Sequence, residues 1–144
     1  MSKEPKILIV DDIEEYLKSL KAILENKFSV ITATSLEDAR NKVSNDIEII
    51  LLDIRLDEND DANKDGLLLL EWIKNKYPEI PVVMMSGYKE FDLAVDSLNL
   101  GASYFLRKPI NSSELNVIIK TIMEKSVLFR ENVELKEKLK KFKT

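Results

Sequence analysis

The sequence predicts an α/β fold: a doubly wound sheet of five parallel strands, followed by an extended C-terminal helix. Five short apolar runs alternate with segments in which apolar residues recur every three or four positions. The third and fourth runs are almost continuously apolar, as in strands that helices cover on both faces. The chain has 144 residues, 44% of them hydrophobic, which is enough for one such domain.

Each predicted strand is rich in residues that favour strands. In chain order the runs are KILIV at 6–10, FSVITA at 28–33, IEIILLDI at 47–54, IPVVMMS at 80–86 and SYFLR at 103–107. The segments between them have helical spacing, as at Tyr16, Leu20 and Leu24 in the first. Thr34 with Glu37 has the spacing of a capping box and predicts the start of the second helix. Right-handed crossovers then give a parallel sheet.

Composition limits the chemistry and the location. The sequence has no Cys and no His, so it lacks disulfides, cysteine zinc sites and the usual general base. No apolar run approaches the roughly 18 to 20 residues of a membrane span, and the start lacks signal-peptide flanks. We therefore expect a cytoplasmic protein without membrane contact. The net charge is −4, and residues 1–135 carry −8, which argues against direct nucleic acid contact.

Polar residues follow four of the five predicted strands. They are Asp11, Asp12, Asp53, Ser86 and Lys108. In doubly wound sheets, ligands bind outside the carboxyl ends of the strands, so we expect these side chains to converge. Three carboxylates brought together repel one another, and a divalent cation removes that conflict. An all-oxygen ligand set favours Mg²⁺, and the Lys and the hydroxyl complete a pocket for a tetrahedral dianion.

Four short motifs resemble the response-regulator receiver domain of bacterial two-component signalling. They are VDD at 10–12, LLDIRL at 51–56, MMSG at 84–87 and FLRKPI at 105–110. The resemblance implies the flavodoxin-like strand order 2-1-3-4-5. It also implies a phosphoacceptor switch in which a partner histidine kinase phosphorylates Asp53. Such a domain is not an enzyme, beyond self-phosphorylation from small donors and slow autodephosphorylation.

The resemblance assigns further roles by position. It implies that Asp11 and Asp12 hold Mg²⁺ together with Asp53, and that Ser86 and Lys108 contact the phosphoryl group. Ser86 is also a switch residue, together with an aromatic residue three positions before the Lys, which here is Phe105. Tyr104 precedes it and is expected to share or exchange that role.

The acidic stretch after Asp53 departs from the family pattern, because Asp57 replaces a common Pro and Gly66 comes late. Its residues match the first half of a calcium-loop pattern at Asp61, Asn63, Asp65 and Gly66. The match fails at the twelfth position, where a bidentate Glu is required and Trp72 stands. The leucines at 67–70 are expected on the core face of the next helix. We therefore expect a solvated loop, with Asp53 as the one chemical residue of the stretch.

Helix-favouring sequence continues to the C-terminal end. An a/d seam with alternating spacings of four and three comprises Leu128, Asn132, Leu135, Leu139 and Phe142. An Asn at an a position favours a parallel pair of helices. We expect a receiver domain at 1–123 and a coiled-coil-like linker at 124–144 that forms a homodimer. The alternative is a single amphipathic helix docked on its own domain.

A receiver followed by such a helix resembles nitrogen-regulation-type transcription activators, which depend on an alternative sigma factor. The resemblance implies that phosphorylation changes the dimer interface and controls an output domain outside this chain. The alternative is a stand-alone receiver, or a pseudo-receiver interaction module, without transcriptional output. A Mg²⁺-dependent aspartyl-phosphate phosphatase would need an acid two residues after Asp53, where Arg55 stands.

Overall fold

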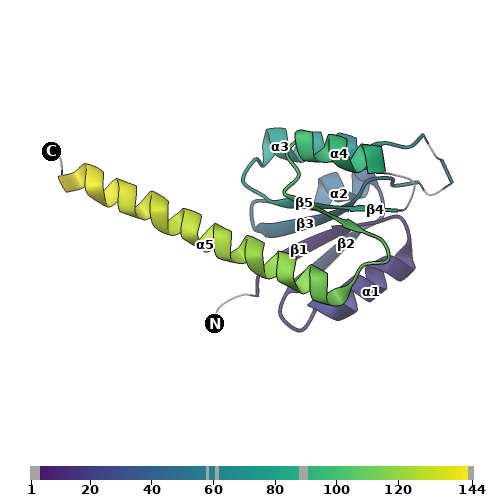
Figure 1. The fold of residues 1–144 in the computed structure, drawn as a ribbon, viewed down its shortest axis with the longest axis horizontal. Coiled ribbons are helices and arrows are strands. Elements are labelled where there is room, and N and C mark those ends of the chain that lie inside the picture. The colour runs from purple at the N-terminus through teal and green to yellow at the C-terminus, as the bar shows by residue number, and fades with distance from the viewer. Residues whose placement is uncertain (1–3, 58, 61, 88–90, 143–144) are drawn as a thin grey trace. The chain divides into compact units, whose positions relative to one another are not determined.

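The computed structural model describes residues 4–142 except 58, 61 and 88–90. The chain forms two compact units, Met1–Ile110 and Asn111–Thr144. The first unit contains the sheet and the second is a single long helix (Figure 1). All five strands lie in the first unit.

The predicted fold class is confirmed. The strands are β1 Lys6–Val10, β2 Ser29–Ala33, β3 Ile47–Asp53, β4 Val82–Ser86 and β5 Tyr104–Arg107. The helices are α1 Glu14–Leu24, α2 Leu36–Lys42, α3 Asp65–Lys76, α4 Phe91–Asn99 and α5 Ser112–Phe142. All strand pairs are parallel, in the order β2-β1-β3-β4-β5. The predicted runs at 28–33, 80–86 and 103–107 began one or two residues early, and that at 47–54 ended one residue late.

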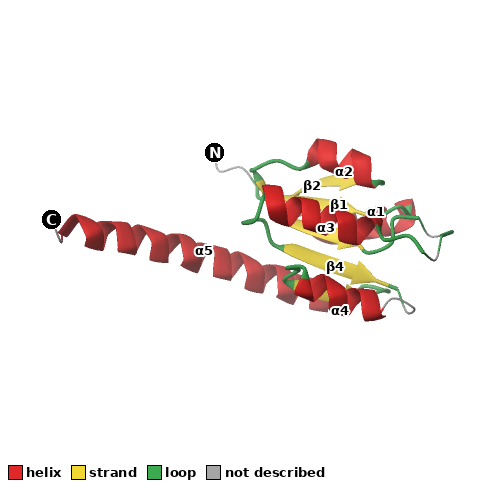
Figure 2. Ribbon diagram, turned by 90° about the horizontal axis from the view of Figure 1, so that it is seen from above, coloured by secondary structure: helices red, strands yellow, loops and turns green. Residues whose placement is uncertain are grey.

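Helices cover both faces of this sheet. In Figure 1, α1 lies on one face, while α2, α3 and α4 lie on the other, and Figure 2 shows these three side by side. Double coverage explains why the central strands are apolar at successive positions: residues 7–10 of β1 and 82–86 of β4 are all buried. Because all five strands are parallel, their carboxyl ends meet at one edge of the sheet.

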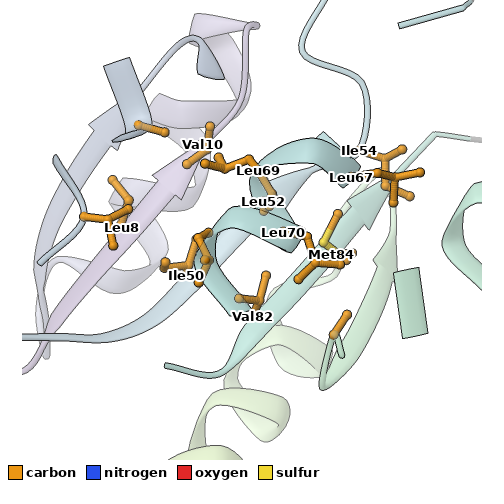
Figure 3. Packing of buried hydrophobic residues seen from close by; sticks show 14 of the residues in the cluster. Leu8, Val10, Ile50, Leu52, Ile54, Leu67, Leu69, Leu70, Val82 and Met84 are labelled. Atoms are coloured by element: carbon orange, nitrogen blue, oxygen red, sulfur yellow. The ribbon is translucent and has the colours of Figure 1, made fainter. Parts of the chain in front are cut away.

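Leucines of α3 contribute to the core between that helix and the sheet. Leu67, Leu69 and Leu70 belong to the same buried cluster as Leu52 and Met84 of the sheet (Figure 3). Leu68 is 51% exposed. The expectation that all residues of 67–70 face the core was wrong, because successive helical residues are about 100° apart and four cannot share one face.

Side-chain caps fix two helix starts. The N-cap of α2 is Ser35, whose Oγ accepts a hydrogen bond from the Asp38 backbone N–H at 3.1 Å. The prediction that used Thr34 as the cap was therefore one residue early. At the start of α5, the side chain of Asn111 accepts a hydrogen bond from the Glu114 backbone N–H at 3.0 Å.

A small aromatic and cationic cluster joins α2 to α3. The Arg40 guanidinium lies 5.7 Å from the centroid of a Trp72 ring, and Lys76 Nζ lies 5.1 Å from it. Tyr77 stands beside the same indole, with ring centroids 5.9 Å apart. Because cations are attracted to the faces of aromatic rings, these contacts tie the two helices together away from the strand ends.

Candidate functional site

The three acidic residues predicted at the strand ends lie together. Asp11 follows β1, and its backbone N–H continues the ladder by donating to Ala33 O at 3.1 Å. Asp53 is the last residue of β3. Asp11 and Asp53 are 0% and 4% exposed, and Asp12 is half-buried. One carboxylate oxygen from each residue lies within 4.8 Å of the others.

Lys108 reaches into this cluster from the end of β5. Its Nζ lies 2.7 Å from Asp11 Oδ2 and 3.3 Å from Asp53 Oδ2, and its side chain is only 10% exposed. Burial on its own would lower the pKa of Lys108, but the charges of Asp53 and Asp11 and the hydrogen bonds to them raise it overall. The ammonium is therefore charged at neutral pH and offsets part of the carboxylate charge.

Asp11 links the site to the start of α1. Its Oδ1 accepts a hydrogen bond from the Ile13 backbone N–H at 2.9 Å, while Oδ2 faces Lys108. Ile13 is the N-cap of α1 and provides no side-chain cap of its own. The carboxylate of Asp11 thus satisfies a backbone donor at the helix start and also binds the ammonium.

Backbone hydrogen bonds bring Ser86 to the same edge. Ser86 is the last residue of β4 and is 2% exposed. Its carbonyl oxygen accepts from the Lys108 N–H at 2.8 Å, and the carbonyl of the preceding Met85 accepts from the Ile54 N–H at 3.0 Å. The end of β4 is therefore hydrogen-bonded to Ile54, the residue after Asp53, and to Lys108.

The two predicted switch aromatics occupy adjacent positions on β5. Tyr104 pairs with Val83 and Phe105 with Met84 of β4. Both side chains are half-buried, and Phe105 packs against the buried cluster. Because successive strand residues point to opposite faces, the two rings leave the sheet on opposite sides.

The cluster fits a hard divalent cation. Asp11, Asp12 and Asp53 offer only carboxylate oxygens, which are the ligands that Mg²⁺ takes in proteins. Two of the three side chains are buried, so their mutual repulsion is poorly screened by water. A divalent ion beside them would relieve that repulsion.

The acidic loop is organised by its own side chains. Asp57 Oδ1 accepts from the Asn59 N–H at 3.1 Å, and Asp60 Oδ1 accepts from the Ala62 N–H at 3.0 Å. Asn63 Oδ1 accepts from both Leu56 N–H and Asp65 N–H at 3.0 Å, which holds the two ends of the loop together. The bonds to the Asn59, Ala62 and Asp65 N–H groups each span two residues and form Asx turns, in which the side chain replaces a backbone partner. Glu58 and Asp61 lie outside the described residues.

Two residues at the site were not predicted from the sequence. Gly66 lies in the first turn of α3 against the end of β3, and its N–H donates to Ile54 O at 2.9 Å. Tyr16 was assigned to the apolar face of α1, but its ring centroid lies 4.2 Å from Lys108 Nζ. The sequence feature that could have indicated this contact is that Tyr16 comes one helical turn after Asp12.

The predicted seam lies in the second unit. Leu128, Leu135 and Leu139 of α5 are 58%, 56% and 59% exposed, and Asn132 is exposed too. The side chain of Phe142 is outside the described part of the chain. Across the residues described, no helix has both the length and the apolar content needed to cross a bilayer. A cytoplasmic location stays a prediction.

Comparisons with known proteins agree with this geometry. A family model described as "Response regulator receiver domain" matches residues 7–120. The nitrogen assimilation regulatory protein NtrX of Azorhizobium caulinodans is 38% identical over 133 residues, covering 91% of this chain and 29% of that protein. An NtrX-like response regulator of Rickettsia bellii is 34% identical over 135 residues, covering 92% of this chain and 28% of that protein.

A solved structure has the same fold. The crystal structure of NtrX from Brucella abortus matches with a TM-score of 0.81 and 31% identity, over 92% of this chain and 29% of that one. The chain thus spans less than a third of the length of these relatives, 28% and 29% of the two curated ones.

Proposed function

The chain belongs to the family of response regulator receiver domains, and on that premise we propose that it is a phosphoacceptor switch in which Asp53 receives a phosphoryl group from a partner histidine kinase. The observation that carries this proposal is the position of Lys108 Nζ, 2.7 Å from Asp11 and 3.3 Å from Asp53. A carboxylate nucleophile, a buried cation and two further carboxylates meet there. Receiver domains are typically signalling modules without enzymatic turnover.

The transfer needs little covalent help from the protein. An oxygen of Asp53 attacks the phosphorus of the kinase's phosphohistidine, and a P–O bond forms as the P–N bond breaks. The electron pair of the broken bond stays on the imidazole nitrogen. The product is an acyl phosphate that carries about −2 where the carboxylate carried −1. Lys108 offsets this added charge, which is the main requirement of phosphoryl transfer beyond positioning.

We propose that Asp11, Asp12 and Asp53 hold Mg²⁺. When bound, the ion supplies positive charge to the phosphoryl oxygens as a Lewis acid. The proposal is supported by the all-oxygen donor set and by the closeness of the three carboxylates, within 4.8 Å of one another. Lys108 then has a second role: its ammonium partly neutralises two of these carboxylates, those of Asp11 and Asp53, when the ion is absent.

We propose that Ser86 and Phe105 transmit the change. Ser86 is buried at the end of β4, where its hydroxyl can donate a hydrogen bond to a new phosphoryl oxygen. Phe105 is half-buried one strand away and lacks a hydroxyl, so it acts through packing alone. Tyr104 leaves β5 on the other face of the sheet, so a movement of its ring would change a different surface of the domain.

A mass measurement tests the phosphoacceptor. Incubation with acetyl phosphate and Mg²⁺ should add one phosphoryl group to the wild type and none to Asp53→Asn. Asp57→Asn is the matched control, because Asp57 is an exposed acid of the following loop and an amide oxygen can keep its turn. A wild type that gains no mass would favour the alternative of a pseudo-receiver, and a gain that survives in Asp53→Asn would place the phosphate elsewhere.

We further propose that residues 124–142 pair with a second copy of this chain and couple phosphorylation to the output of a transcription activator. The exposed leucines 128, 135 and 139 support this, since they leave an apolar seam on α5. The similarity to NtrX supports the regulatory context. Direct nucleic acid contact by this chain is not part of the proposal.

Sedimentation with and without beryllofluoride and Mg²⁺ tests the pairing. The wild type should be a dimer whose mass or shape changes with the phosphate mimic. Leu135→Lys should give a monomer, whereas Val133→Lys, an exposed position outside the seam, should not. A wild-type monomer under both conditions would contradict the pairing and leave the phosphoacceptor proposal standing.

A further inference from the structure

An aromatic ring completes the surroundings of the Lys108 ammonium. Besides Asp11 and Asp53, the ammonium faces the ring of Tyr16, with Nζ 4.2 Å from the ring centroid. Cations within about 6 Å of a ring centroid are attracted by the negative face of the ring. The Lys108 side chain is 10% exposed, so little water competes for the contact. Neither the phosphoacceptor chemistry nor the metal site accounts for this ring.

The ring is placed by the same residue that binds the ammonium. Asp11 Oδ1 accepts from Ile13 N–H at 2.9 Å, and Tyr16 N–H donates to Ile13 O at 3.1 Å to close the first turn of α1. Asp11 Oδ2 meanwhile lies 2.7 Å from Lys108 Nζ. The carboxylate thus fixes both the helix turn that carries Tyr16 and one side of the lysine.

We propose that Tyr16 is a positioning residue for Lys108 in phosphorylation of Asp53, and that its ring face holds the ammonium over the acceptor carboxylate. The inference rests on the proposed function. A lysine has a flexible four-carbon stem, and fixing it costs side-chain entropy. An aromatic face on one side and two carboxylates on the other leave the ammonium one favourable position.

The ring and not the hydroxyl carries this role, because the contact is to the ring centroid. Tyr16→Phe should therefore keep the rate of phosphorylation by acetyl phosphate with Mg²⁺. Tyr16→Leu keeps apolar volume but loses the ring face, and the rate should fall about three- to tenfold. Tyr16→Met, a second ringless variant, guards against a folding defect specific to leucine. Urea unfolding of each variant checks that the domain is folded.

Two readouts separate positioning from a general structural effect. In a Lys108→Met background, Tyr16→Leu should cause no further loss of rate, because the residue through which Tyr16 acts is gone. In proton NMR of the unphosphorylated protein, the ε-methylene protons of Lys108 should be shifted upfield by the ring current. The shift should persist in Tyr16→Phe and disappear in Tyr16→Leu.

The outcomes distinguish this inference from the proposed function. If the wild type is phosphorylated but Tyr16→Leu and Tyr16→Met react at the wild-type rate, Tyr16 does not position Lys108. An equal loss in the Lys108→Met background also overturns the inference, since it shows an effect independent of the lysine. If the wild type takes up no phosphate, the proposed function fails, and an absent ring-current shift would separately refute the contact.

Discussion

Gly66 packs directly against the carbonyl group of Asp53. A Cβ atom on Gly66 would lie 2.2 Å from Asp53 O and 2.3 Å from Ile54 O. Both are backbone oxygens, so they cannot rotate away as the tip of a flexible side chain could. The first turn of α3 can approach the end of β3 only because it carries no side chain at this point, and that contact holds the backbone of Asp53, the residue that we propose as the phosphoacceptor.

Gly66→Ala should therefore affect both stability and the site. The forced shift should cost about 1 to 3 kcal/mol in the free energy of unfolding, measured with urea. It should also slow phosphorylation of Asp53 by acetyl phosphate, since the strand end has to move. Gly101→Ala is the control: Gly101 has φ +106°, so the change costs about 1 to 2 kcal/mol through backbone strain, but its neighbour is the Lys74 side chain. Equal phosphorylation rates for the two variants would show that α3 does not position Asp53.

The ion pairs of Lys108 predict a pH dependence of stability. Its pKa is raised on folding above the ordinary value of 10.5, so its contribution is fully present below that value and is lost as the pH rises through the folded pKa. In metal-free buffer, Lys108→Met should thus lower the free energy of unfolding at neutral pH, and the difference from the wild type should shrink above pH 10.5. Lys18→Met, at an exposed position on α1, should show no such convergence. A difference that stays constant through the alkaline range would contradict the prediction.

The same ammonium should compete with the metal. Lys108 Nζ lies beside two of the three carboxylates that we propose as Mg²⁺ ligands, so its positive charge opposes a divalent cation. Titration calorimetry should show tighter Mg²⁺ binding to Lys108→Met than to the wild type, and weaker binding to Asp12→Asn. The midpoint of thermal unfolding should rise with Mg²⁺ concentration in the wild type, because a ligand that binds the native state stabilises it. Equal affinity in the wild type and Asp12→Asn would remove Asp12 from the metal site.

The two hydrogen bonds accepted by Asn63 Oδ1 should hold the ends of the acidic loop together. Asn63→Ala removes the oxygen that accepts from both Leu56 N–H and Asp65 N–H, and we expect a loss of about 1 to 2 kcal/mol. Amide hydrogen exchange at positions 56 and 65 should accelerate. Asn59→Ala is the matched control, since residue 59 takes part through its backbone N–H alone in the turn with Asp57. Unchanged exchange at both amides in Asn63→Ala would show that these two hydrogen bonds do not hold the loop ends.

Deleting residues 58–62 tests a role of the acidic loop in signalling. The loop follows directly from the strand that carries Asp53, and its described carboxylates at 57 and 60 are engaged in turns with their own backbone. A loop that shields the acyl phosphate should give the wild type a longer acyl-phosphate lifetime than the deletion variant. A loop that selects the kinase should give the two proteins different preferences among kinases. Equal values for both would leave the loop as a solvated connection.

Much of the architecture could be predicted because it depends on local patterns. Continuous apolar runs specify central strands, and the rule that parallel strands end at one edge brings Asp11, Asp53 and Lys108 together. The strand order came from resemblance, since periodicity alone does not order strands. The cap of α2 was misplaced by one residue because Thr34 and Ser35 can both cap a helix.

The contacts that the sequence did not predict depend on packing between distant elements. Tyr16 fits an apolar helix face by spacing, and only the position of β5 reveals that its ring meets Lys108. Leu68 belongs to a run of four leucines, and which of them is exposed depends on the face that α3 turns toward the sheet. The need for glycine at position 66 likewise arises from the close approach of α3 to β3.

The contact between α2 and α3 gives this protein a built-in optical probe. Trp72 is the one tryptophan of the sequence, and its indole is flanked by the charged groups of Arg40 and Lys76. Its emission wavelength therefore depends on how those two charges are arranged around the ring. A change in fluorescence reports on a single, known location, so loosening of this helix pair can be followed in real time without attaching a dye.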